Sequence, residues 1–194
     1  MLCSIYSLEI LYKKYASNSR LSFLCVPLER SEKGMEFYMD EEKLNNNNSN
    51  FKMTTEEAMK LIDMMKERVS EATLEFPRIG AKLEFDVFAK REGTKFIVSI
   101  KRGKIDKRKC TYQGRTYFNN IPLLRLDITN SFHINSDGTK ITGNHLHIYN
   151  EMTEMRDAIP FNIDDADLYK YCLEFFKKFN IIQDNCGILY QMEL

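Results

Sequence analysis

Two neighbouring runs of alternating apolar and polar residues constrain the fold of this chain more than any other feature. The apolar positions of the two runs are Leu83, Phe85 and Val87, then Phe96, Val98 and Ile100. Successive side chains of a strand point to opposite faces of a sheet, so each run predicts a strand with one buried face. A Glu92-Gly93 turn separates the runs, and the pair is therefore expected to form an antiparallel hairpin.

Further strands and two helices are predicted around this hairpin. Strand candidates span residues 109–115, 121–129, 144–149 and part of 181–190. A capping box formed by Thr54 and Glu57 begins a helix, whose apolar stripe consists of Ala58, Leu61, Ile62, Met65, Val69 and Ala72. Asp164-Asp165 caps a second helix over about 165–179. This order predicts an α+β fold in which an antiparallel β-meander packs against two helices.

An asparagine-rich tract over residues 45–50 divides the chain and is typical of a flexible linker. We expect a small N-terminal appendage of one helix and one strand over residues 1–44, a linker over 45–52 and an α+β main domain over 53–194. A piece of 44 residues rarely folds alone, so the appendage is expected to pack on the main domain or on a partner.

Composition excludes several classes of function. The chain carries 28 basic and 28 acidic residues, so its overall charge predicts no polyanionic partner, and a nucleic-acid site would have to rest on a local patch. Five scattered cysteines without a Cys-x-x-Cys pair indicate reduced thiols and a cytoplasmic protein. No apolar run is long enough for a membrane span, and no glycine-rich phosphate loop or Gly-x-Ser-x-Gly motif indicates an NTPase, a dehydrogenase or an α/β hydrolase.

The histidines of this chain are clustered, because all three fall within fifteen positions, at His133, His145 and His147. Histidine titrates near neutral pH and is the commonest metal ligand, so this segment is the strongest candidate for a chemical site. On a strand over residues 144–149, Leu146 and Ile148 are expected to face the core. His145, His147 and Tyr149 then share the opposite face, with the two imidazoles about 7 Å apart.

Three interpretations of this histidine face stay open. In the first, the imidazoles are solvated or paired with carboxylates and carry no chemistry. In the second, His145 and His147 are the general base and acid of a metal-independent ribonuclease, with Arg125 as the nearby cation. In the third, they ligate a divalent metal ion such as zinc or iron, with His133 or Asp137 as the third ligand. No other cofactor is indicated.

Arg125 and Asp127 alternate with apolar residues and share one face of the predicted strand over residues 121–129. If this strand lies beside the histidine strand, its two polar side chains line one surface with His145 and His147. The alternative is an ordinary ion pair on a half-buried sheet.

The highest local charge lies between residues 101 and 109, where six basic residues and one acidic residue give a net charge of +5. Such a segment can neutralise phosphates, and interleaved aromatic rings can stack on unpaired bases. Alternatively, it is a solvated hairpin edge whose lysines block pairing with other sheets. The candidate nucleic-acid-binding residues are Lys101, Arg102, Lys104, Lys107, Arg108, Lys109, Tyr112 and Arg115.

Four segments resemble a small family of uncharacterised bacterial and phage proteins: residues 110–115, residues 124–128, the His133-x-Asn135-x-Asp137-Gly138 motif and the His145-x-His147-Ile148-Tyr149 motif. The resemblance covers residues 54–194 and implies a single α+β domain from mobile-element neighbourhoods. It transfers no catalytic residues. Two departures are the absence of an aromatic residue before Ala158-Ile159-Pro160 and the additional first 52 residues.

Two classes of function follow. The favoured hypothesis is a phage or mobile-element accessory protein that binds a nucleic acid or a nucleoprotein enzyme without catalysis, for example by inhibiting a host-defence nuclease. The alternative is an enzyme, either a toxin-type ribonuclease that uses His145 and His147 or a metal-dependent enzyme. The metal-dependent enzyme requires His133 to converge with the other two histidines. The oligomeric state stays open.

Overall fold

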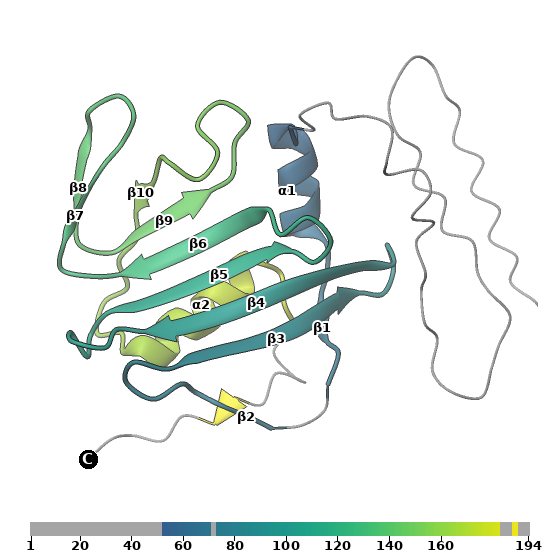
Figure 1. Cartoon of the computed structure of the whole chain (residues 1–194), viewed down its shortest axis with the longest axis horizontal. Helices are drawn as coiled ribbons and strands as arrows, with labels where there is room; N and C mark the ends of the chain where they lie inside the picture. Colours follow the sequence, from purple (N-terminus) through teal and green to yellow (C-terminus); the bar gives the residue numbers. More distant parts are fainter. Residues whose placement is uncertain (1–51, 71–72, 183–187, 190–194) are drawn as a thin grey trace, which may run out of the picture. The chain divides into compact units, whose positions relative to one another are not determined.

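Seven strands form one antiparallel sheet in the computed structural model (Figure 1). In spatial order they are β1 (Glu67–Arg68), β3 (Lys82–Ala89), β4 (Thr94–Arg102), β5 (Cys110–Thr116), β6 (Pro122–Ile128), β9 (His145–Ile148) and β10 (Ile159–Pro160). The structure describes residues 52–70, 73–182 and 188–189. The appendage predicted over residues 1–44 and nearly all of the predicted linker lie outside the described residues.

Two smaller pairs of strands flank this sheet. The strands β7 (Phe132–Ile134) and β8 (Lys140–Thr142) form an antiparallel hairpin. The strands β2 (Leu74–Glu75) and β11 (Ile188–Leu189) pair in parallel. The expected hairpin is confirmed as β3 and β4, in which Val87 pairs with Phe96.

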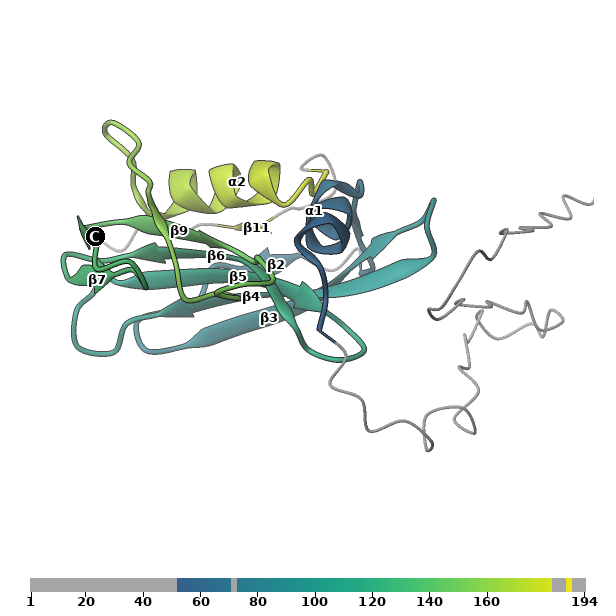
Figure 2. The same ribbon diagram turned by 90° about the horizontal axis from the view of Figure 1, so that it is seen from above.

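Both helices, α1 (Thr55–Asp63) and α2 (Leu168–Lys178), cover the same face of the sheet (Figure 2). Between them and the strands lies the core, and its fully buried side chains include Phe96, Ile100, Tyr112, Leu124, Leu126, Phe175, Phe176 and Phe179. The predicted α+β meander with two helices is therefore confirmed. Among the described residues, no helix has the length and apolar character needed to cross a membrane.

The first helix is shorter than its apolar stripe predicts. The capping box of Thr54 and Glu57 is present, but α1 ends at Asp63, and Met65 is 54% exposed. The reason lies one residue further on, where Lys66 is fully buried and bonded to carbonyl groups at the ends of both helices. Because Lys66 leaves the helical path, forms a bridge with Ile181 and is followed directly by β1, the later part of the predicted stripe does not form a helix.

The second helix begins two residues later than the predicted cap. Its N-cap is Asp167, whose side chain accepts a hydrogen bond from the backbone N–H of Lys170. Asp165 has a φ of 50°, a left-handed conformation that does not continue into a helix. The cap therefore belongs to the last aspartate of this segment.

Gly114 allows α2 to approach β5 closely. A Cβ atom at this position would lie 2.6 Å from Cε1 and Cζ of Phe179, which is fully buried and packs edge-on against Phe96. We expect Gly114→Ala to lower the free energy of unfolding by about 2 kcal/mol, because the added methyl group overpacks the core. Urea unfolding of the purified variant measures this loss.

The matched variant for this test is Gly114→Ala combined with Phe179→Leu. Leucine lacks the ring atoms that the added methyl group would meet. The double variant should therefore lose less free energy of unfolding than the sum of the losses in the two single variants. Additive losses would show that the close approach of Phe179 does not set the requirement for glycine.

Candidate metal centre

Polar side chains occupy the sheet face that points away from the two helices, and the antiparallel register aligns them in rows. One row across β4, β5, β6 and β9 consists of Lys101, Thr111, Asp127 and His145. The adjacent row consists of Ser99, Gln113, Arg125 and His147. The predicted juxtaposition of the Arg125 strand with the histidine strand is therefore observed.

The alternation predicted for the histidine strand is observed from His145 to Ile148, which packs against the core like Leu146. Leu146 belongs to the core, and both His145 and His147 lie on the opposite face. The expectation for Tyr149 is wrong, because β9 ends at Ile148 and Tyr149 joins the core, where its hydroxyl donates to the carbonyl of Met53 at 3.0 Å.

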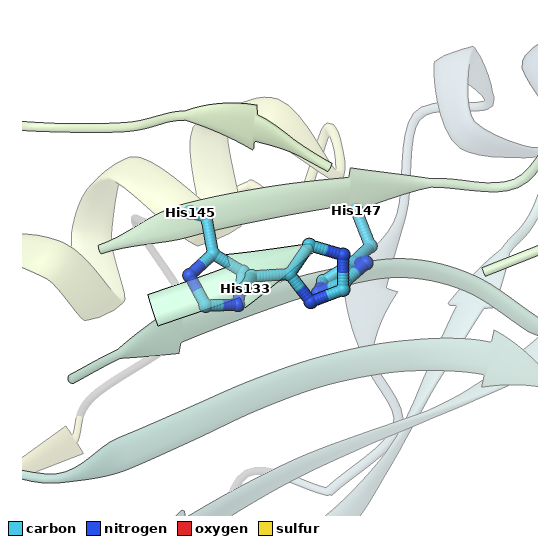
Figure 3. Close-up of side chains that lie close together, drawn as sticks. All are labelled: His133, His145 and His147. Atoms are coloured by element: carbon cyan, nitrogen blue, oxygen red, sulfur yellow. The ribbon is translucent and has the colours of Figure 1, made fainter. Parts of the chain in front are cut away.

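The third histidine reaches this face from the β7–β8 hairpin. Figure 3 shows the rings of His133, His145 and His147 pointing toward one another, with the sheet and α2 behind them. One ligand nitrogen from each ring can be chosen so that all three lie within 4.8 Å of one another. The three ring centroids are 4.9 to 5.1 Å apart.

The hairpin is fixed by a reciprocal pair of hydrogen bonds to the segment that precedes β10. The side chain of Asn135 donates to the carbonyl of Ala158 at 3.0 Å and accepts from its N–H at 2.9 Å. Beside this pair, Asp157 accepts hydrogen bonds from the N–H and the hydroxyl of Ser136. These contacts place His133, two residues before Asn135, against β9.

Each histidine ring uses one nitrogen for a backbone carbonyl. Nδ1 of His145 lies 2.8 Å from the carbonyl oxygen of Gly143, and Nδ1 of His147 lies 3.0 Å from that of Asp157. Nε2 of His133 lies 2.8 Å from the carbonyl oxygen of Arg156. A carbonyl oxygen only accepts hydrogen bonds, so each of these nitrogens carries the proton.

The tautomers that follow leave three lone pairs for a ligand. These lie on Nε2 of His145, Nε2 of His147 and Nδ1 of His133. Burial lowers the pKa of His145, which favours its neutral, ligating form. Metal-binding histidines almost always donate their second ring nitrogen to a carbonyl or a carboxylate in this way.

Asp127 and Arg125 complete the surroundings of these nitrogens. Oδ2 of Asp127 lies 3.4 Å from Nε2 of His147 and 3.7 Å from Nε2 of His145. Burial opposes the ionisation of this carboxyl, whereas the hydroxyl of Thr111 and the guanidinium group of Arg125 favour it and hold the pKa of Asp127 below its usual value. The carboxylate is therefore charged at neutral pH.

The guanidinium group of Arg125 contacts both the carboxylate of Asp127 and the imidazole of His147. Its Nε donates to Oδ2 of Asp127 at 2.9 Å, and its Nη2 donates to Nε2 of His147 at 2.8 Å. The nitrogen that His147 offers to a metal ion thus accepts a hydrogen bond from Arg125. Binding of an ion at the three histidines requires Arg125 to release this one bond while keeping the bond to Asp127.

The side chains of the centre differ in their exposure to solvent. The side chain of Arg125 is 32% exposed and that of Asp127 is 19% exposed, whereas His147 is fully buried. The partly exposed side chains of the centre therefore include those on β6. A general acid or base must touch the substrate, so the burial of His147 disfavours the predicted acid–base pair of a metal-independent ribonuclease.

Three of the predicted nucleic-acid-binding residues are committed to contacts within the domain. Tyr112 is fully buried and its hydroxyl donates to the carbonyl of Leu168, so it cannot stack on a base. Arg102 is buried and donates to the carbonyl groups of Pro77 and Lys107. Arg115 is mostly buried and forms an ion pair with Glu84 at 2.8 Å.

The remaining predicted residues of the basic segment lie at the surface. Lys101, Lys104, Lys107 and Arg108 are exposed, and Lys109 is half-buried. Hydrogen bonds within the loop hold it in shape, including one from the N–H of Gly103 to the carbonyl of Lys109 at 2.7 Å.

The sequence does not predict the backbone groups that contribute to the centre. The carbonyl groups of Gly143, Arg156 and Asp157 set the tautomers of the rings, and a backbone acceptor has no residue signature. The hydroxyl of Thr111, which donates to Oδ1 of Asp127 at 2.7 Å, is likewise a part of the site that the sequence analysis does not predict.

Comparison with known proteins places the chain in a family without assigning it an activity. No curated protein and no solved structure matches the chain significantly. A family model does match residues 53–181, which include every element from α1 to α2 and all three histidines. The chain belongs to DUF6978, a family of unknown function.

Proposed function

We propose that this protein binds one divalent transition-metal ion through His133, His145 and His147 and uses it to activate water for hydrolysis. The observation that supports this proposal is the hydrogen-bonding pattern of the rings. Each donates one N–H to a backbone carbonyl and so keeps a lone pair on its second nitrogen, and one nitrogen of each ring can be chosen so that the three lie within 4.8 Å of one another. Two of these nitrogens, Nε2 of His145 and Nε2 of His147, lie beside the carboxylate of Asp127, and such a set of groups favours a cation.

Zinc fits this set of ligands best. Zinc binds imidazole nitrogens at about 2.0–2.1 Å and is commonly held by three protein ligands in catalytic sites, where water takes the fourth position. One nitrogen of each ring can be chosen so that the three lie within 4.8 Å of one another, and movements of the rings would bring them to that distance from one ion. Coordination to zinc lowers the pKa of water to about 7, so the water becomes a nucleophile at neutral pH.

Asp127 is the proton acceptor in this proposal. Its Oδ2 lies 3.4 and 3.7 Å from the two Nε2 atoms that would hold the ion, so it is adjacent to a water on the fourth position. Thr111 and Arg125 fix both oxygens of the carboxylate in place. A fixed, ionised carboxylate next to a coordinated water can accept its proton and orient it toward a substrate.

Metal titration of the purified, EDTA-stripped protein tests the proposal. We expect one equivalent of zinc to bind, and cobalt(II) in its place to give the visible spectrum of a four-coordinate site. His133→Asn should weaken zinc binding at least about 100-fold, since losing even a hydrogen-bond partner of a ligand costs 10–100-fold. His133 is the most exposed of the three histidines, so its replacement is the least damaging to the fold.

Asp137→Asn is the matched control on the same hairpin. Asp137 is the alternative third ligand that the sequence predicts, but its carboxylate is exposed and accepts hydrogen bonds from Thr139. This variant should bind zinc as tightly as the unchanged protein. Equal losses in the two variants, or no stoichiometric binding in the unchanged protein, would refute the metal centre.

We also retain binding without catalysis as a second candidate function, in which an accessory protein of a phage or mobile element in the bacterial cytoplasm engages a nucleic acid or a nucleoprotein enzyme. The observation that favours it is the ordered basic loop, where the 97% exposed Ile105 lies among Lys104, Lys107 and Arg108. Replacing these three cations by Gln should abolish partner binding under this hypothesis. A metal-dependent activity that survives the same change would favour the hydrolytic centre.

A further inference from the structure

We infer that the substrate of this centre is a phosphodiester bond in a single-stranded nucleic acid, and that Lys101 and Lys109 bind its neighbouring phosphates. The inference rests on the proposed metal centre and adds the class of substrate. It is carried by the register of the sheet, by the charges around the histidines and by the partial exposure of Arg125 and Asp127.

The register places the two lysines next to the centre. Lys101 pairs with Thr111, Thr111 pairs with Asp127, and all three lie on the sheet face that carries the histidines. Neighbouring strands are about 4.8 Å apart, so the backbone of Lys101 lies about 10 Å from that of Asp127. The side chain of Lys101 is exposed and is long enough to span much of this distance.

Lys109 reaches the same region from the end of β5. It precedes Thr111 by two positions, so strand alternation places it on the same face. Its Nζ donates to the hydroxyl of Ser131 at 3.0 Å, two residues before His133. Lys101 and Lys109 therefore both lie on the Asp127 side of the centre.

The charge of the centre favours a phosphate over a neutral group. An ion held by His147 takes the nitrogen to which Arg125 now donates, so Nη2 of Arg125 is released beside the ion. Arg125 remains bonded to Asp127, which keeps the released Nη2 directed toward the centre. A divalent ion and a guanidinium group outweigh the one carboxylate, and guanidinium binds phosphate oxygens through charge-assisted hydrogen bonds.

The depth of the centre selects a single strand. His147 is fully buried, whereas Arg125 is partly exposed. A duplex holds its phosphates on a stiff helix. A single strand can bend one phosphate inward while the adjacent phosphates stay on the surface lysines.

The reaction is hydrolysis. The oxygen of the coordinated water forms a bond to phosphorus as the bond from phosphorus to the leaving oxygen breaks. The proton of the water passes to Asp127, and the leaving oxygen takes a proton from solvent. The products are one phosphate monoester and one free hydroxyl, and water is the only co-reactant.

The experiment compares a nucleic-acid strand with a small phosphodiester, using the zinc-loaded full chain. We expect a labelled 20-nucleotide RNA or DNA strand and bis(p-nitrophenyl) phosphate both to be hydrolysed, and EDTA to stop both reactions. The change K101Q with K109Q should raise KM for the strand about tenfold and reduce the salt slope of its binding by about 1.4, because two phosphate contacts are lost. The turnover of the small ester should fall far less than that of the strand, since the small ester has no neighbouring phosphates for the lysines to contact.

The control variant is K177Q with K178Q, which removes the same charge from exposed positions on α2, on the opposite face of the sheet. It should behave as the unchanged protein. Zinc bound with no hydrolysis of either strand, or equal KM values in the two double variants, would overturn the inference and leave the metal centre intact. Absence of stoichiometric zinc binding would refute the proposed function itself. A preference for RNA over DNA would support the inference and assign a role to the 2′-hydroxyl.

Discussion

Replacing Lys66 by Met is expected to lower the free energy of unfolding by about 3 kcal/mol or more. Nζ of Lys66 donates to the carbonyl groups of Ile62, Met64 and Phe179 at 2.7 to 2.9 Å. The first two carbonyl groups lie at the end of α1, and the third follows α2. Methionine fills a similar volume but provides no donor, and each buried carbonyl left without a partner costs about 1–3 kcal/mol.

Two further contacts favour the lysine at this position, and one effect opposes it. The ammonium group lies 4.3 and 4.7 Å from the ring centroids of Phe179 and Phe96, where cation–π attraction adds to the hydrogen bonds. Burial of the charge is unfavourable and lowers the pKa of Lys66 to about 7. Methionine removes this desolvation cost, which is why the expected loss is smaller than the sum over three carbonyl groups.

Urea unfolding measures this effect, with Lys60→Met as the control. Lys60 lies on the exposed side of α1 and pairs only with Glu56 at the surface, so its replacement should leave the unfolding midpoint nearly unchanged. If both variants unfold at the same urea concentration, Lys66 does not connect the ends of the two helices.

Lys66 also explains where sequence-based prediction of the fold stops. Local patterns are sufficient for the β3–β4 hairpin, the capping box and the strands β5, β6 and β9, because their alternation and spacing are visible in short windows, whereas β1 and β10 are not predicted. The end of α1 depends on Phe179, which is 113 residues away from Lys66 in the chain. A helical stripe that continues in the sequence is interrupted by a contact that no local window contains.

The basic segment over residues 101–109 shows a second limit of sequence-based prediction. Its charge is visible in the sequence, but strand alternation divides it between two faces. Arg102 follows Val98 and Ile100 at every second position and shares their buried side, while Lys101 points to the opposite face. Extending the two-residue period of the hairpin to the end of its second strand is sufficient to separate these two residues from the sequence alone.

The histidine centre was predictable in part. The side-by-side placement of Arg125 and His147 follows once β6 and β9 are neighbours. The convergence of His133 does not follow from any period, because it depends on Asn135 bonding to Ala158, 23 residues further along the chain. The three histidines can therefore be recognised as candidates in the sequence. The contact of Asn135 with Ala158 determines that His133 meets the other two.

Zinc is expected to raise the free energy of unfolding by about 4 kcal/mol when its free concentration is 1,000 times its dissociation constant. This value follows from mass action, because an ion that binds only the folded chain stabilises it by RT ln(1 + [zinc]/Kd). The three ligands come from β7 and β9. Unfolding separates these two strands, so the unfolded chain does not hold the three ligands together. Urea unfolding in buffered zinc and in EDTA measures the difference.

The gain should be concentrated in the β7–β8 hairpin. In the described part of this hairpin Ile141 is buried, whereas Phe132 and Ile134 are more than half exposed, so the metal-free hairpin is held mainly by Asn135 and Ser136. An ion on His133 and the two histidines of β9 adds a direct connection to the central sheet, so zinc should slow hydrogen exchange of residues 132–142 more than that of the β3–β4 hairpin. His133→Asn should abolish both the slower exchange and the added stability, while Asp137→Asn should preserve them. Uniform slowing over the whole domain, or a gain that persists in His133→Asn, would mean that zinc acts at another place in the chain.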